Sequence, residues 1–186
     1  MEKHKIKEIL NTLCRVLEEV PEIRYVGDGV LRIKAQAVEV LEGNTIVDQL
    51  GKVLLRYRET SGIGRGLAAP QIGINKAVFV IFVDDKIQAF LNPKILERSK
   101  ETNFFRELCI SSGVMAADVE RSEWVIMEWT DQNGKTRKEK FEGFLARLLQ
   151  HEEAHLRGVV NLDEASPKGI QFVTFDPSKE ILRNDR

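Results

Sequence analysis

A helical run late in the chain restricts the fold more than any other feature. Residues 144–156 (FLARLLQHEEAHL) place apolar side chains three and four positions apart, which is the spacing of an amphipathic helix. Within this run, His151 and His155 lie one helical turn apart on one face, so both imidazoles can reach a single metal ion. Only three histidines occur in the chain, which argues against a chance pair on an exposed face. Glu152, next to the first histidine, can take the proton of an attacking water. The predicted apolar face consists of Phe144, Leu145, Leu148, Leu149 and Leu156.

The other patterns predict strands joined by hairpins and helices that stand apart from them. Asn133-Gly134 favours the positive-φ turn of a tight hairpin, and Asp84-Asp85 separates two further apolar runs. Asp28-Gly29 and Gly43-Asn44 predict two more turns. The predicted helices span residues 6–20, 46–57 and 144–156, and the predicted strands span 77–83, 88–90, 124–129 and 136–141.

Hairpins with segregated helices are typical of an α+β fold and not of alternating βαβ units. We therefore expect antiparallel strands and hairpins packed around a central HExxH helix, with an extra N-terminal helix. The predicted division is an N-terminal helical extension over residues 1–20 and one main domain over residues 21–186.

Charge and cysteine content exclude several classes of protein. The 28 Lys and Arg nearly balance the 29 Asp and Glu, which argues against a DNA-binding surface. No run approaches the roughly 18 apolar residues of a membrane span, and no signal peptide is visible, so we expect a cytoplasmic protein without a membrane partner. Cys14 and Cys109 are too few for a disulfide scaffold, and Cys14 is expected in the core on the apolar face of the first helix.

A hydrolytic metal site commonly has three protein ligands and one open position, so the two histidines leave one ligand to find. Cys109 is a candidate, although a single cysteine is more often a small buried hydrophobic residue. A glycine-rich segment at residues 61–73 (SGIGRGLAAPQIG) offers a second feature. Its closely spaced glycines let the backbone approach a ligand or a strand edge, and no Gly-Lys-Ser/Thr follows to make it a phosphate-binding loop.

Three segments together resemble the peptide deformylase family. They are GRGLAAPQIG at 64–73, ELCIS at 107–111 and QHEEAH at 150–155, where the family has GxGxAAPQxG, EGCxS and QHExDH in the same order and spacing. The resemblance extends over roughly residues 23–163. It implies an enzyme, a metal-dependent amide hydrolase that removes the formyl group from the N-terminal formyl-methionine of nascent peptides.

The resemblance also implies a role for each matching residue. Cys109, His151 and His155 would ligate one divalent metal ion, Fe²⁺ in the cell and Zn²⁺ or Ni²⁺ as alternatives in purified protein. Glu152 would act as the general base and then the general acid. The side-chain amide of Gln71 would help to hold the oxyanion of the transition state.

Further residues would bind the substrate or complete the oxyanion site. The backbone N–H of Ile110 would be the second oxyanion donor. Gly64 and Gly66 would pair with the peptide backbone as an added strand does, and Leu108 would lie at the cleft wall.

Two positions depart from the family motifs. Leu108 stands where the family has glycine, so its side chain would either narrow the substrate groove or point into the core. Ala154 stands where the family has aspartate, which predicts that Arg121 loses its usual partner and that metal affinity changes. Glu153 is not expected to replace that aspartate, because adjacent helix positions face different directions.

Two other functions stay open. One is a deformylase-like amidase that acts on another N-formyl or N-acyl substrate, and the other is a catalytically weak homologue that binds peptides. The expected partner is a formyl-methionyl peptide. Residues 135–140 (KTRKEK) are expected to form a solvated hairpin face, with a transient ribosome contact as the alternative. The sequence decides neither the oligomeric state nor the role of the first helix.

Overall fold

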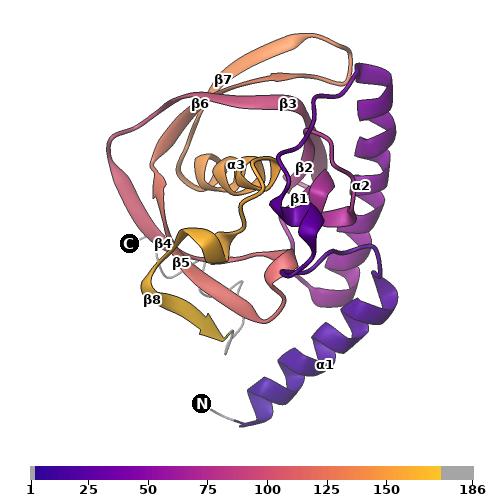
Figure 1. The fold of residues 1–186 in the computed structure, drawn as a ribbon, viewed down its shortest axis with the longest axis vertical. Helices are drawn as coiled ribbons and strands as arrows, with labels where there is room; N and C mark the ends of the chain where they lie inside the picture. The colour runs from indigo at the N-terminus through magenta and orange to yellow at the C-terminus, as the bar shows by residue number, and fades with distance from the viewer. Residues whose placement is uncertain (1–2, 173–186) are drawn as a thin grey trace.

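The computed structural model describes residues 3–172, which form two antiparallel sheets and three α-helices (Figure 1). One sheet has five strands in the order β1-β2-β3-β6-β7, and the other has three in the order β4-β5-β8. This is the predicted α+β fold. The helices are α1 (Lys3–Glu19), α2 (Val40–Ser61) and α3 (Gly143–Leu156), and the short 3₁₀ segments are η1 (Gly29–Arg32), η2 (Ala69–Ile72), η3 (Ile110–Ser112) and η4 (Asn161–Glu164). The strands are β1 (Gly66–Ala68), β2 (Val78–Val83), β3 (Lys86–Arg98), β4 (Thr102–Leu108), β5 (Met115–Ser122), β6 (Trp124–Thr130), β7 (Thr136–Glu142) and β8 (Ala165–Phe172).

Helix α3 lies between the two sheets, and α2 lies on the side of β2 that faces away from α3 (Figure 1). Leu148, Leu149 and Leu156 of α3 pack with Phe79 and Phe90 of β2 and β3 in one hydrophobic cluster. A second cluster joins α2 to the opposite face of β2. This arrangement fixes α3 from one side and leaves its other side facing β4 and β5.

Both predicted hairpins are confirmed. β2 and β3 pair through Val83 and Lys86, and Asp84 and Asp85 between them have φ of 50° and 55°. β6 and β7 pair from Trp124–Glu142 to Thr130–Thr136, and Gly134 in their turn has φ of 78°. These positive values are the left-handed conformation that tight hairpin turns need. β7 exposes nearly all of its side chains, as predicted for the charged hairpin face.

The predicted turn at Gly43-Asn44 is wrong. Both residues lie inside α2, which begins at Val40 and is longer than the predicted helix. A Cβ at position 43 would overlap the side chain of Leu91 on β3. Gly43 therefore allows the close approach of α2 to the sheet and does not end the helix.

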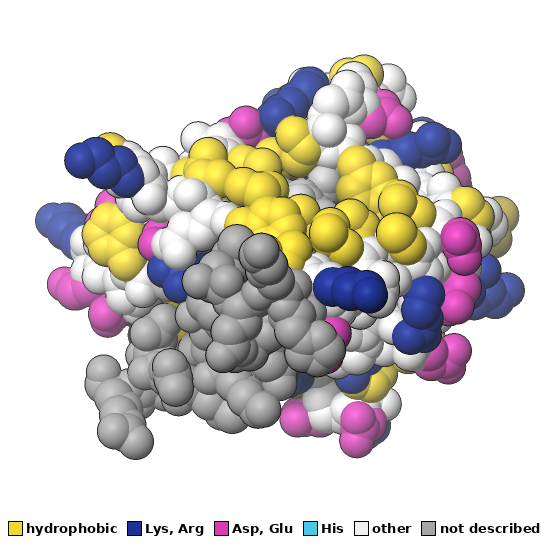
Figure 2. Space-filling model, turned by 90° about the horizontal axis from the view of Figure 1, so that it is seen from below, with side chains coloured by type: hydrophobic (Ala, Val, Ile, Leu, Met, Phe, Trp, Pro, Cys, Tyr) yellow, Lys and Arg dark blue, Asp and Glu magenta, His cyan; other side chains and the backbone are white. Residues whose placement is uncertain are grey.

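Helix α1 is covered on part of its apolar face only. Val16 is buried against α2, but Leu10 and Leu17 are 42% and 49% exposed. Cys14 is exposed, so the expectation of a core position is wrong. Viewed from the end at which α1 lies, apolar side chains form a band across this surface of the molecule (Figure 2). Among residues 3–172, no helix is long and apolar enough to cross a bilayer.

Candidate metal centre

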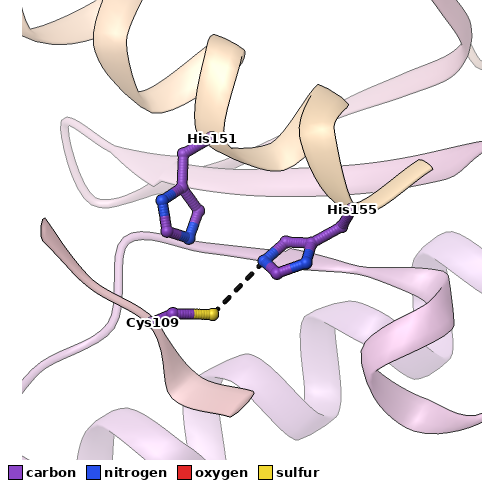
Figure 3. Close-up of side chains that lie close together, drawn as sticks. All are labelled: Cys109, His151 and His155. Carbon is purple, nitrogen blue, oxygen red and sulfur yellow. Dashed lines mark hydrogen bonds between the residues drawn. The ribbon is translucent and has the colours of Figure 1, made fainter. Parts of the chain in front are cut away.

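Helix α3 and the end of β4 bring three candidate ligands together. His151 and His155 project from the same face of α3, and Cys109 follows β4 at the start of η3. Their side chains point toward one another (Figure 3). His155 Nε2 lies 3.3 Å from Cys109 Sγ, and the three ligand atoms lie within 4.8 Å of one another. All three residues are buried.

This donor set fits a divalent metal ion. Around a tetrahedral ion with Zn–S near 2.3 Å and Zn–N near 2.0 Å, ligand atoms lie roughly 3.3 to 3.8 Å apart, and thiolate and imidazole are both common ligands of such an ion. Two buried polar atoms at this site, Glu152 Oε2 and His155 Nδ1, have no hydrogen-bond partner in the part of the chain that the structure describes. Buried polar atoms are seldom left unpaired, and such exceptions often mark places where a ligand or water binds.

The environment of Cys109 favours the thiolate that a metal requires. Burial alone raises the pKa of the Cys109 thiol, but the charge of His155 and hydrogen bonds from both histidines outweigh it and hold that pKa well below its ordinary value. Burial lowers the pKa of His151, and hydrogen bonds with Cys109 and Glu107 reverse this and raise the pKa well above its ordinary value. The lowered pKa of Cys109 and the raised pKa of His151 both favour the charged forms, and metal binding to such ligands is coupled to the release of protons.

Glu107 orients the first histidine. His151 Nδ1 donates to Glu107 Oε2 at 2.9 Å, which leaves Nε2 as the ring atom available to a metal. Burial raises the pKa of Glu107, but His151 and Arg121 outweigh it and hold the pKa far below its ordinary value. The Glu107 side chain is 6% exposed. Sequence reasoning missed this role, although the alternation along β4 places Glu107 two positions before Cys109, on the inward side.

Arg121 has two carboxylate partners although position 154, where the family has aspartate, carries alanine. Arg121 Nε and Nη2 donate to the two oxygens of Glu107 at 3.0 and 2.9 Å, and Nη1 donates to Glu164 at 2.6 Å. Glu153 does not take part, because it pairs with Arg157 at 2.9 Å. The second carboxylate that pairs with Arg121 therefore belongs to Glu164 of η4, a segment outside the three family motifs.

Gln71 is held in one orientation beside Cys109. Its Oε1 accepts the backbone N–H of Ala68 at 2.8 Å, which turns the amide nitrogen inward. Gln71 Nε2 then donates to Ser111 Oγ at 3.1 Å and to Cys109 Sγ at 3.6 Å. Gln71 is 1% exposed. Ile110 begins η3 directly after Cys109.

Glu152 packs against the glycine-rich segment. Burial raises the pKa of Glu152 to about 7, and the nearby histidines reduce that effect. A Cβ at Gly66 would overlap the Glu152 carboxyl group, so only glycine allows this contact. Gly66 begins β1, which is an edge strand of the five-stranded sheet. Gly64 lies just before β1 with φ of 119°, a conformation that side chains rarely adopt.

The two departures from the family motifs lie in different surroundings. Ala154 is 1% exposed inside α3. Leu108 ends β4 opposite Ala116 and is half-buried, and strand alternation directs it away from the face that carries Glu107. Leu108 belongs to neither hydrophobic cluster among the described residues.

Comparisons with known proteins find similar chains over most of this sequence. The family model described as polypeptide deformylase matches residues 20–171. A peptide deformylase of Pseudothermotoga lettingae is 36% identical over 167 residues, which is 90% of this chain and 95% of that protein. One from Thermotoga maritima is 39% identical over 147 residues, 78% of this chain and 87% of that protein.

Solved structures give the same result. The crystal structure of peptide deformylase from Thermotoga maritima has 38% identity and a TM-score of 0.67, and the match covers 78% of this chain and 97% of that chain. A peptide deformylase from Synechococcus elongatus in complex with actinonin has 35% identity and a TM-score of 0.69, covering 78% and 79%.

Proposed function

The chain belongs to the polypeptide deformylase family, and on that premise we propose that it removes the formyl group from the N-terminal formyl-methionine of nascent peptides. The observation that carries this proposal is the meeting of Cys109, His151 and His155 in one buried space, with Glu152 on the same helix. These three residues would hold a divalent metal ion. Fe²⁺ is the proposed ion in the cell, with Zn²⁺ or Ni²⁺ as alternatives in purified protein.

When bound, the metal supplies Lewis acidity that makes water a nucleophile near neutral pH and polarises the formyl oxygen. The protein supplies the proton transfers. Among residues 3–172, Glu152 Oε2 has no hydrogen-bond partner, so it can accept the proton of the attacking water. The same carboxyl group then donates a proton to the departing amine. A pKa near 7 suits both roles, because the group must exist in both protonation states at cellular pH.

Charge that develops on the formyl oxygen would be held by two N–H groups. Gln71 Nε2 already points toward Cys109 because Ala68 fixes the amide through Oε1. The backbone N–H of Ile110 is the second proposed donor. Preset donors of this kind cost no reorganisation during the reaction, and removal of one typically costs about 3 kcal/mol in the transition state.

The edge of β1 is the proposed place for the peptide backbone. An edge strand presents free N–H and C=O groups to an incoming chain, and β1 ends the five-stranded sheet. Gly64 and Gly66 would keep this edge clear for the peptide, next to Glu152. Leu108 is proposed to lie at the wall of the cleft, where it would restrict the side chains that fit.

The test uses full-length protein loaded anaerobically with Fe²⁺, and it measures formate release from a short formyl-methionyl peptide. Glu152→Ala is expected to keep the metal but lose about 10²- to 10⁴-fold in turnover, the usual contribution of a general base. Cys109→Ser is expected to lose the metal. Cys14→Ser is the matched control, because Cys14 is exposed on α1, and it should keep both metal and activity.

The alternatives predict different results. Stoichiometric metal without turnover would favour another N-formyl or N-acyl substrate, or a peptide-binding role. A folded wild-type protein that binds no metal would contradict the assignment of all three ligands.

We also propose that residues 21–186 form the catalytic domain and that residues 1–20 are an added helical extension. The family match begins at residue 20, and α1 packs chiefly on α2. The proposed location is the cytoplasm, where the formyl-methionyl peptide is the partner. The exposed side chains of β7 are the proposed place for a transient ribosome contact.

A further inference from the structure

A chain of charged groups runs from the metal centre to the surface. His151 Nδ1 contacts Glu107 at 2.9 Å, Glu107 contacts Arg121 at 3.0 and 2.9 Å, and Arg121 contacts Glu164 at 2.6 Å. The side chains of Glu107 and Arg121 are 6% and 5% exposed, whereas that of Glu164 is 28% exposed. Glu164 is therefore the first group of the chain that is substantially exposed, and beyond it Arg157 Nη2 donates to Glu164 Oε1 at 3.5 Å.

Arg121 and Arg147 carry two positive charges, and the single carboxylate of Glu107 neutralises only one of them. Glu164 supplies the second negative charge. Glu107 accepts hydrogen bonds from two guanidinium groups, those of Arg121 and Arg147, in addition to His151. Arg147 is anchored elsewhere as well, by the side chain and the carbonyl oxygen of Asn103. Without Glu164, two buried cations would share one carboxylate, and Arg121 Nη1 would lose its partner. Uncompensated buried charge is strongly unfavourable, so Arg121 would move to find another partner.

The position of Glu164 is fixed by η4. Asn161, at the start of η4, donates to the backbone oxygen of Glu107 at 3.1 Å and accepts from Ser112 Oγ at 2.6 Å. Asp163 accepts the backbone N–H of Val160 at 2.8 Å. These contacts connect η4 to both sides of Cys109, so Glu164 meets Arg121 in a set geometry.

A cavity of about 470 Å³ opens beside the Arg121–Glu164 pair, and both residues line it. Glu120 lines the same cavity, but its carboxylate accepts from Thr102. A small carboxylate in solution can therefore reach Arg121 when the Glu164 side chain is removed.

We propose that Glu164 is a positioning residue for the metal centre, which holds Arg121 from the cavity side and so keeps Glu107 against His151. The inference rests on the proposed metal site. Hydrogen-bond partners of metal ligands commonly change metal affinity by 10- to 100-fold, and Glu164 acts one step farther out, so we expect an effect of about tenfold.

The experiment measures the Zn²⁺ dissociation constant of the full-length protein by competition with a chelator, and the visible spectrum of the Co²⁺-loaded protein. Glu164→Ala is expected to weaken Zn²⁺ binding about tenfold and to shift the Co²⁺ bands, and added acetate should restore both. Glu120→Ala removes a carboxylate from the same cavity and should leave both readouts as in wild type. Glu164→Gln, which keeps the size of the side chain, should weaken Zn²⁺ binding without rescue by acetate.

An unchanged dissociation constant in a folded Glu164→Ala or Glu164→Gln variant overturns the inference. Weaker Zn²⁺ binding in Glu164→Ala that acetate does not restore also overturns the inference, because Glu164 would then have a merely structural role. If wild-type protein itself does not bind Zn²⁺, the proposed metal site fails first and this inference fails with it. Zn²⁺ binding by wild type, together with either of the first two results, overturns this inference alone.

Discussion

Helices α1 and α3 have the same spacing of apolar residues but very different surroundings. α3 buries ten of its residues, and five of those are polar: Arg147, Gln150, His151, Glu152 and His155. α1 exposes Leu10, Leu17 and Cys14 on the face that its spacing marks as apolar. Periodicity therefore predicts that a helix has a face to cover, but the number of elements around it decides how much is covered.

The buried polar residues of α3 differ in whether their side-chain atoms have hydrogen-bond partners. Arg147, Gln150 and His151 each have a hydrogen-bond partner on another element, which is the normal condition of a buried polar group. Glu152 Oε2 and His155 Nδ1 are the exceptions. On α1, by contrast, no polar side chain among residues 6–19 is buried, although Glu19 accepts a hydrogen bond from Thr60 of α2. Buried polar groups, and above all the unpaired ones, distinguish the functional helix from the peripheral one.

The largest expected effect tests how firmly α3 is packed. Leu149 is fully buried between α3 and the five-stranded sheet. Leu149→Ala should lower the free energy of unfolding by about 2 to 5 kcal/mol, because it leaves a cavity as well as removing apolar contact. Urea denaturation measures this change. A loss below about 1 kcal/mol would mean that α3 is as loosely held as α1.

The next effect tests the close contact between α3 and β1. A Cβ at position 66 would overlap the Glu152 carboxyl group, so Gly66→Ala must displace the proposed base. Displacement of a reacting group by about 1 Å can cost about 100-fold, and we expect a loss of this size in kcat/KM for formyl-methionyl peptides.

Gly51→Ala is the matched control for Gly66→Ala. Gly51 is buried in α2, and the nearest atom to an added Cβ is 4.0 Å away, so activity should be unchanged. Wild-type kinetics in Gly66→Ala would show that β1 can retreat from α3, which would break the contrast between a rigid α3 and a loosely covered α1.

The smallest effect is expected on α1. Leu17 is 49% exposed, and Leu17→Ala should change the free energy of unfolding by no more than about 0.5 kcal/mol. Its neighbour Val16 is 2% exposed, and Val16→Ala should cost about 1 to 2 kcal/mol, because it removes buried apolar groups. A cost at Leu17 equal to that at Val16 would show that the apolar face of α1 is covered in solution.

Local sequence patterns predict the helices and hairpins but not the three-stranded sheet. β4 (TNFFREL) and β5 (MAADVERS) have no continuous apolar run, and β5 pairs with β8 across a long separation in sequence. Such strands are held by pairing between distant segments, so a short stretch of sequence does not predict them. The same limit explains Gly43, whose place in α2 depends on Leu91 of a remote strand.

The candidate site shows the same division. Spacing alone places His151 and His155 on one helix face with Glu152 next to the first of them, and the family motifs add Cys109 and Gln71, which the structure brings beside them. The sequence analysis gave no role to Glu107 or Glu164, because charged residues are ordinarily on the surface. Their roles follow only when β4, β5 and η4 come together around Arg121.

The three-stranded sheet and α3 are connected at the candidate centre by residues far apart in the chain. Cys109 and His155 are separated by 46 positions, yet their ligand atoms lie 3.3 Å apart. An ion bound there would close this long loop as a cross-link does, and it would restrict the unfolded chain more than the folded one. Metal occupancy would then set how often β4 and β5 separate from α3, so the cofactor would govern the durability of the enzyme as well as its chemistry.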